Sequence, residues 1–114
     1  MTVLRPISLP LHGALELLVG VLALAAPFAL GFGAAGMVVA FLIGACSVGL
    51  ALDAAQPARV AAHLAFDYGL AFGAVLAAIP LALAGDATAA LALGGLGLAQ
   101  LGLNAGTRYT ARGS

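Results

Sequence analysis

The sequence predicts an all-α, polytopic membrane protein whose four transmembrane helices form two tandem, parallel-repeat helical hairpins in a single membrane domain, 1–114. The chain is 64% hydrophobic and 7% charged, with a mean hydropathy of +1.19, whereas soluble domains are about half apolar and about a quarter charged. So short a chain cannot hide this much apolar surface in its own interior. The lipid bilayer is therefore its expected surrounding.

Four apolar runs approach the ~20 residues that a helix needs to cross a bilayer. We expect helices over about 11–32, 37–52, 60–84 and 87–105. The connections between them are short, so successive helices should be antiparallel neighbours. Strands are not expected, because the runs are rich in Ala and Leu and lack period-two alternation.

The positive charges predict the orientation of the chain in the membrane. The four basic residues are Arg5, Arg59, Arg108 and Arg112. All of them fall on one side of the four expected helices, and arginine-rich loops stay on the cytoplasmic side. We expect cytoplasmic N- and C-termini in a bacterial cytoplasmic (inner) membrane. The net charge is zero, so no basic face is available for nucleic acid.

An internal repeat relates the two halves of the chain. A shift of 51 positions superimposes three polar pairs, which are His12 with His63, Glu16 with Asp67, and Asp53 with Asn104. Repeat 1 covers about 8–55 and repeat 2 about 59–106, and the polar tail 107–114 is expected to be frayed. Each unit holds two helices, so both units have the same orientation in the membrane.

Prolines and small residues predict local features of the helices. Pro27 and Pro80 lie near the non-cytoplasmic ends of the first and third helices, where each is expected to cause a kink or stop. Small residues recur at a spacing of four, at Gly36, Ala40 and Gly44 and at Gly69, Gly73 and Ala77. Such stripes let helices approach closely. We expect them to pack inside the chain, or alternatively against a second copy or another membrane protein.

A family resemblance rests on the start and the turn of each half. The stretch 11–20 (Leu-His-Gly-Ala-Leu-Glu-Leu-Leu-Val-Gly), followed by Ala-Pro-Phe at 26–28 and Gly-Phe at 31–32, resembles the SPW-repeat family of small bacterial integral membrane proteins. In place of the family's Ser-Pro-Trp turn the chain has Ala-Pro-Phe and, at 79–81, Ile-Pro-Leu. The resemblance implies a two-hairpin membrane fold and carries over no catalytic residue.

Most ionisable side chains of the helices are expected in one shallow layer at the cytoplasmic side. The layer comprises His12, Glu16, Asp53, His63, Asp67, Gln100 and Asn104. Acids are costly in a membrane, which makes them candidates for function. The layer has four interpretations: a hydrogen-bonded belt that ties the halves together, a proton or cation relay, a metal site of two His and two carboxylates, or a haem between two His.

The sequence contains no catalytic motif, and no cofactor is predicted from it. It favours a non-enzymatic structural, accessory or self-associating membrane protein. One alternative is a small proton- or cation-coupled transporter that uses Glu16 and Asp67. Another is a metal- or haem-binding membrane protein that uses His12 and His63. The lone Cys46 is expected to be a small buried apolar side chain.

Overall fold

The computed structural model describes residues 5–54 and 59–110, and these residues form one elongated bundle of four helices. The bounds are α1 Leu9–Leu30, α2 Ala34–Ala54, α3 Val60–Leu83 and α4 Ala87–Ala105. Each helix is long and apolar enough to cross a membrane. The bundle measures 43 × 23 × 21 Å. The predicted fold class, an all-α polytopic membrane protein, is confirmed.

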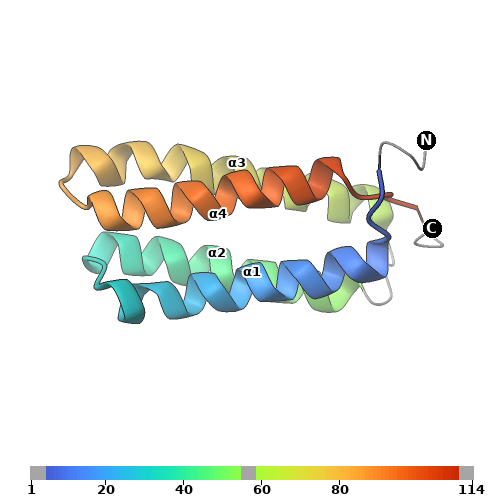
Figure 1. The fold of residues 1–114 in the computed structure, drawn as a ribbon, viewed down its shortest axis with the longest axis horizontal. Helices are drawn as coiled ribbons and strands as arrows, with labels where there is room; N and C mark the ends of the chain where they lie inside the picture. Colours follow the sequence, from blue (N-terminus) through green and yellow to red (C-terminus); the bar gives the residue numbers. More distant parts are fainter. Residues whose placement is uncertain (1–4, 55–58, 111–114) are drawn as a thin grey trace.

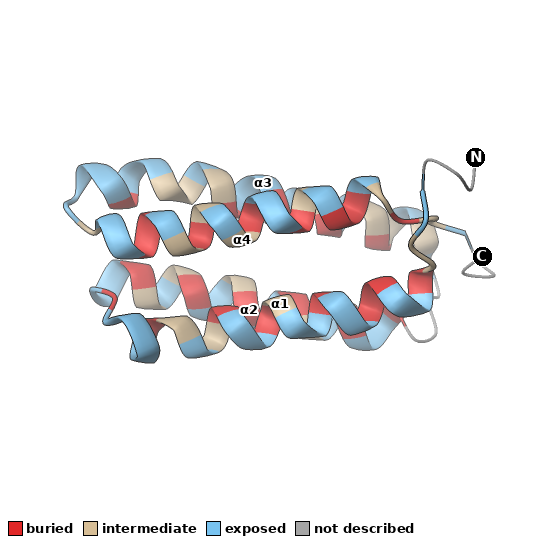
Figure 2. Cartoon of the chain, viewed as in Figure 1, coloured by how far each residue is buried: buried red, intermediate tan, exposed pale blue. Residues whose placement is uncertain are grey.

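The helices pair as two antiparallel hairpins, α1 with α2 and α3 with α4 (Figure 1). Both hairpins begin at the same end of the bundle, where α2 and α4 also end. We call this the polar end and the opposite end the apolar end. Packing is denser within each hairpin than between the two hairpins. Buried residues form stripes on the inner faces of the helices, and the outer faces are exposed (Figure 2).

Local signals fix the ends of α1. The Ser8 hydroxyl accepts a hydrogen bond from the Leu11 backbone N–H, and Pro10 occupies the first turn, where its missing N–H costs nothing. The helix ends at Gly31, whose φ of 71° lies in the left-handed region that favours glycine. These caps shift the helix two residues towards the N-terminus from the expected 11–32.

The two prolines lie inside the last turns of their helices rather than at the stops. Beyond Pro27 the helix continues to Leu30, and beyond Pro80 it continues to Leu83. The Pro27 carbonyl accepts the N–H groups of both residues that follow α1, at 3.0 and 3.1 Å. Each proline therefore lies in the turn that ends its helix, and a kink at these positions stays a prediction.

The same close crossing of helices occurs once in each hairpin. A Cβ added at Gly44 would lie 3.0 Å from the Gly20 carbonyl oxygen, and one added at Gly97 would lie 2.9 Å from the Ala71 carbonyl oxygen. Such distances leave no space for a side chain. Gly36 and Ala40 of the predicted α2 stripe are also buried. Small residues therefore bring the two helices of each hairpin into backbone contact.

The α3 stripe was predicted wrongly as packing inside the chain. Gly69 and Gly73 are exposed, and a Cβ at either position would meet no atom of the described residues within 4 Å. Ala77 is only partly buried, and the helix packs through Ala71 and Ala74 instead. Cys46, expected to be buried, is likewise exposed on the outer face of α2. Apolar residues face both lipid and protein here, so hydropathy does not set the rotation of a helix.

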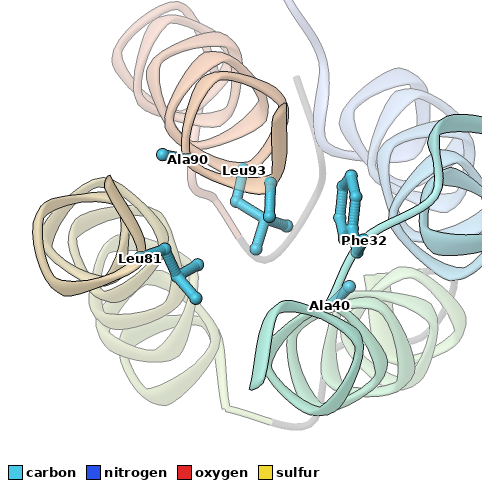
Figure 3. Packing of buried hydrophobic residues seen from close by; sticks show 6 residues of the cluster. Phe32, Ala40, Leu81, Ala90 and Leu93 are labelled. Atoms are coloured by element: carbon cyan, nitrogen blue, oxygen red, sulfur yellow. The ribbon is translucent and has the colours of Figure 1, made fainter. Parts of the chain in front are cut away.

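An apolar cluster joins the hairpins at the apolar end. Figure 3 shows Phe32 and Ala40 from the first hairpin facing Leu81, Ala90 and Leu93 from the second. Asp86 adds a polar link at the same end. Its carboxylate caps α4 at the Ala89 N–H, 3.2 Å away, and accepts the Gly33 N–H at 2.8 Å. One side chain thus starts α4 and holds the turn of the opposite hairpin.

Candidate metal centre

The polar end brings together all seven residues of the layer that the sequence singled out. Three helices supply buried pairs at positions i and i+4, which share a helix face. They are His12 and Glu16 on α1, His63 and Asp67 on α3, and Gln100 and Asn104 on α4. Asp53 of α2 lies at the edge, with 43% of its side chain exposed. The layer is therefore a closed cluster with one exposed carboxylate.

Four atoms at the centre alternate between nitrogen and oxygen. Asp67 Oδ2 lies 2.9 Å from His12 Nε2 and 3.1 Å from His63 Nε2. Glu16 Oε1 lies 3.3 Å from His12 Nε2 and 3.5 Å from His63 Nε2. One ligand atom from each of the four residues lies within 4.8 Å of the others. Ligands held at 2.0–2.2 Å around a tetrahedral ion are about 3.3–3.6 Å apart. The four nitrogen–oxygen distances are close to this spacing, and the four atoms as a set lie within 4.8 Å.

These close approaches do not have the direction of hydrogen bonds. Among the residues that the structure describes, His12 Nε2, His63 Nε2 and Glu16 Oε1 are buried and take part in no hydrogen bond. Buried polar atoms are rarely left in this state. The atoms converge on a common region rather than pairing with one another.

The outer nitrogen of each imidazole is held by an acceptor. The Thr107 hydroxyl donates its proton to the Leu103 carbonyl at 2.6 Å, so it must accept from His12 Nδ1–H at 2.8 Å. His63 Nδ1–H donates to Asp53 Oδ2, also at 2.8 Å. Both rings therefore place Nε2 at the centre. Metal-bound histidines are commonly fixed in this way, which orients the ring and selects the tautomer.

The two amides hold Glu16 from the side of α4. The Gln100 Nε2 group donates to Glu16 Oε2 at 3.1 Å and to Asn104 Oδ1 at 2.7 Å. These bonds use Oε2 and leave Oε1 directed at the two imidazoles. Gln100 and Asn104 thus position a carboxylate and place no atom in the central ring.

Tyr109 closes the cluster from outside the membrane-spanning helices. Its single hydroxyl proton has two acceptors within reach, Asp67 Oδ2 at 2.8 Å and Asn104 Oδ1 at 3.2 Å, and the shorter distance favours Asp67. Its ring lies 5.3 Å from that of His12. Burial raises the pKa of the Tyr109 phenol, and the hydrogen bond to the Asp67 carboxylate raises it further. Tyr109 is therefore a permanent hydrogen-bond donor at neutral pH.

The tail that carries Tyr109 is tied to the N-terminal segment. Ile7 N–H donates to the Gly106 carbonyl at 2.9 Å, and Arg108 N–H donates to the Ile7 carbonyl at 2.8 Å. The expected fraying of 107–114 is therefore wrong for 107–110, and 111–114 lie outside the described residues. Thr107 and Tyr109 are the functional residues that sequence reasoning did not place in the cluster. They lie beyond α4 and outside the aligned parts of the repeat, so the repeat gave no signal for them.

The charges of the cluster define what it can bind. Two buried carboxylates carry two negative charges, and isolated buried charges are too costly to persist. Two imidazolium protons balance them, and so does one divalent cation bound to two neutral imidazoles. The cluster can therefore exchange two protons for one divalent ion without changing its net charge.

The interior beneath the cluster becomes apolar within a short distance. A cavity of about 10 Å³ adjoins Ser47 and Gln100, which is about the space of one water molecule. Beyond Ser47 the described residues contribute no fully buried polar side chain towards the apolar end. Among the described residues the buried polar side chains are thus confined to one end of the bundle and the region beside Ser47.

Comparison with family models, curated proteins and solved structures finds no match to this chain. The resemblance to the SPW-repeat family stays a prediction.

Proposed function

We propose that this integral membrane protein binds one divalent transition-metal ion at its polar end, in a bacterial cytoplasmic membrane with the N- and C-termini on the cytoplasmic side. The observation that carries the proposal is the convergence of two imidazole nitrogens and two carboxylate oxygens. Each hairpin supplies one nitrogen and one oxygen, and the nitrogen–oxygen distances are 2.9–3.5 Å. Arg5, Arg59 and Arg108, the arginines within the described residues, lie at that end and support the orientation.

A metal site accounts for features that a hydrogen-bonded belt leaves unexplained. In a belt, each buried nitrogen would donate along its N–H direction to an oxygen. Here both Nε2 atoms and Glu16 Oε1 lack such a partner among the described residues. A bound ion satisfies all three at once, because lone pairs and not N–H groups then point at the centre.

The donor set favours a particular class of ion. Neutral imidazoles and carboxylates together suit Zn²⁺, Fe²⁺ or Mn²⁺, whereas Ca²⁺ and Mg²⁺ prefer oxygen ligands and retained water. The burial of His12 and Asp67, both 0% exposed, favours a dehydrated ion. A haem is disfavoured, because carboxylate oxygens lie within 3.5 Å of both Nε2 atoms and a porphyrin would displace them.

The ion would also join the two halves of the protein. His12 and Glu16 belong to the first hairpin and His63 and Asp67 to the second, so a bound ion bridges the loosely packed interface between hairpins. An ion that binds only the folded state raises the free energy of unfolding, by an amount that grows with the logarithm of the ratio of the free ion concentration to Kd. A structural or accessory role, as the sequence favours, would then depend on the bound metal. Transport is less favoured, because the interior towards the apolar end is apolar.

The test is metal binding by the purified, detergent-solubilised chain with Zn²⁺ and with Co²⁺, whose visible spectrum reports nitrogen and oxygen ligands. We expect one ion per chain and a rise in the thermal unfolding temperature. The double variant Glu16→Gln, Asp67→Asn keeps the size of both side chains and should bind no ion. The matched control Asp86→Asn changes an acid at the apolar end and should bind normally. Equal binding by all three proteins, or none by the unmodified chain, would overturn the proposal.

A further inference from the structure

The proposed ion site is closed on two sides. Towards the water at the polar end it is covered by Tyr109 and Thr107, whose segment is bonded to Ile7. Towards the middle of the bundle it is followed by the cavity of about 10 Å³ beside Ser47, Ala71 and Ala74, and beyond Ser47 the described residues bury no polar side chain. An ion must therefore reach the site from another direction.

A cavity of about 360 Å³ lies beside the cluster, where α2 ends and α3 begins. Its lining residues are Leu50, Asp53, Arg59, Ala62, His63 and Phe66. Asp53 and His63 belong to both the cavity and the cluster, and Arg59 is exposed at its edge. The cavity is therefore in direct side-chain contact with the proposed site.

His63 separates the cavity from the ion site. Its Nδ1 is bonded to Asp53 Oδ2 at 2.8 Å on the cavity side, and its Nε2 faces Glu16 and Asp67 on the other. Asp53 is the one carboxylate of the cluster that is substantially exposed, at 43%. An ion in the cavity meets this carboxylate before it meets any of the four central atoms.

We propose that the cavity between α2 and α3 is the access path for the divalent ion, with Asp53 as the first, transient ligand and His63 as the side chain that admits the ion to the site. The inference rests on the proposed function. Arg59 opposes the approach of a cation and Asp53 favours it. The loading rate therefore depends on the charge at these two positions, whereas the final number of ions per chain does not depend on Arg59.

The first experiment measures the rate at which Co²⁺ enters the purified, metal-free protein at low salt. The Arg59 carbonyl accepts the His63 N–H at 3.0 Å, and substitutions of the side chain keep this backbone bond. Arg59→Gln and Arg59→Glu should therefore accelerate loading progressively, by about 3-fold to about 10-fold. Arg5→Gln removes the same charge at the same end of the bundle but away from the cavity, and should change the rate less than twofold. Raising the salt should reduce the differences. Equal rates for all variants would contradict the proposal.

The second experiment blocks the cavity. In a Cys46→Ala background, Ala62→Cys places a thiol in its wall, and Leu52→Cys places one on the exposed outer face of α2 as a control. Labelling with a bulky methanethiosulfonate should slow Co²⁺ loading about 10-fold or more at position 62 and leave it unchanged at position 52. Both proteins should bind one ion at long times.

The outcomes separate the two proposals. If both labelled proteins load at the same rate and bind one ion, the access path is wrong and the metal site stands. If no variant and no unmodified chain binds Co²⁺ or Zn²⁺, the metal site itself is wrong. Thermal unfolding of each labelled protein shows whether a slow rate reflects a blocked cavity or an unfolded chain.

Discussion

The two ends of the bundle join the same pair of hairpins by different means. At the polar end, buried side chains from both hairpins converge on a central group of nitrogen and oxygen atoms. At the apolar end, Phe32 and Ala40 pack against Leu81 and Leu93, and a single acid, Asp86, links the turn of one hairpin to the start of α4. Buried polar side chains meet at one end, and apolar side chains pack at the other.

This difference indicates how a small membrane protein can support a costly polar cluster. Burying charged groups costs least near the membrane surface, where the cluster lies. Without an ion its buried, unpaired atoms lower the stability, because each has lost its contact with water. The apolar end needs no ligand and can hold the hairpins together when the site is empty of metal. The two ends should therefore respond differently to mutation.

The largest effect is expected when both histidines are removed. His12→Ala together with His63→Ala deletes both nitrogen ligands and should abolish Co²⁺ binding. This loss exceeds the roughly 10–100-fold that follows removal of a residue that only orients a ligand. Visible spectra and metal analysis of the purified protein measure it. Retention of one ion per chain by this variant would show that the metal binds elsewhere.

The next effect concerns stability at the apolar end. Leu93→Ala removes a fully buried side chain from the interface between hairpins and should lower the free energy of unfolding by about 2 kcal/mol. Leu98→Ala alters the same helix at a position that is 62% exposed, and should have almost no effect. Unfolding in mixed micelles compares the two. Co²⁺ binding by folded Leu93→Ala should be unchanged. Loss of Co²⁺ binding would mean that packing at the apolar end controls the geometry of the polar end.

A smaller effect is expected at Asp86. Asp86→Ala removes the cap of α4 and the bond to the Gly33 N–H, and should cost about 1 kcal/mol. Asp86→Asn keeps an oxygen for the cap and should cost less. The same unfolding experiment measures both variants. Equal stability of Asp86→Ala and the unmodified chain would show that the cap is dispensable and that packing alone holds this end.

The smallest effect is expected at Tyr109. The pKa of the Tyr109 phenol is raised above its ordinary value of 10.0 in the folded state. Above that pH the phenol loses its proton in the unfolded state while it keeps it in the folded state. The free energy of unfolding should therefore fall as the pH rises above about 10. Tyr109→Phe should lose about 1 kcal/mol at neutral pH, for the hydrogen bond to Asp67, and should show a weaker fall. Unfolding measured from about pH 9 to about pH 11 tests this. Identical pH profiles for Tyr109→Phe and the unmodified chain would show that Tyr109 is not bonded to the cluster.

Much of the fold could be predicted because helix length and hydropathy are local properties. The expected fourth helix, 87–105, matches α4, and the third differs from α3 by one residue. The first and second differ by two or three residues at their ends, where Ser8 and Gly31 set the limits of α1 through hydrogen bonds and backbone conformation. The polar pairs could be placed at one depth because both repeats start and end at the same face.

By itself, the sequence determined the number of helices, their direction and the level at which the His and acid side chains lie. Only the tertiary structure decided which faces meet. Gly44 contacts the neighbouring backbone whereas Gly69 faces outwards, and Thr107 and Tyr109 complete the cluster from a segment with no hydropathy signal. The physical reason is that lipid and helix interior are equally apolar. Hydropathy therefore fixes how deep a residue lies in the membrane, and only contacts between helices fix the direction in which its side chain points.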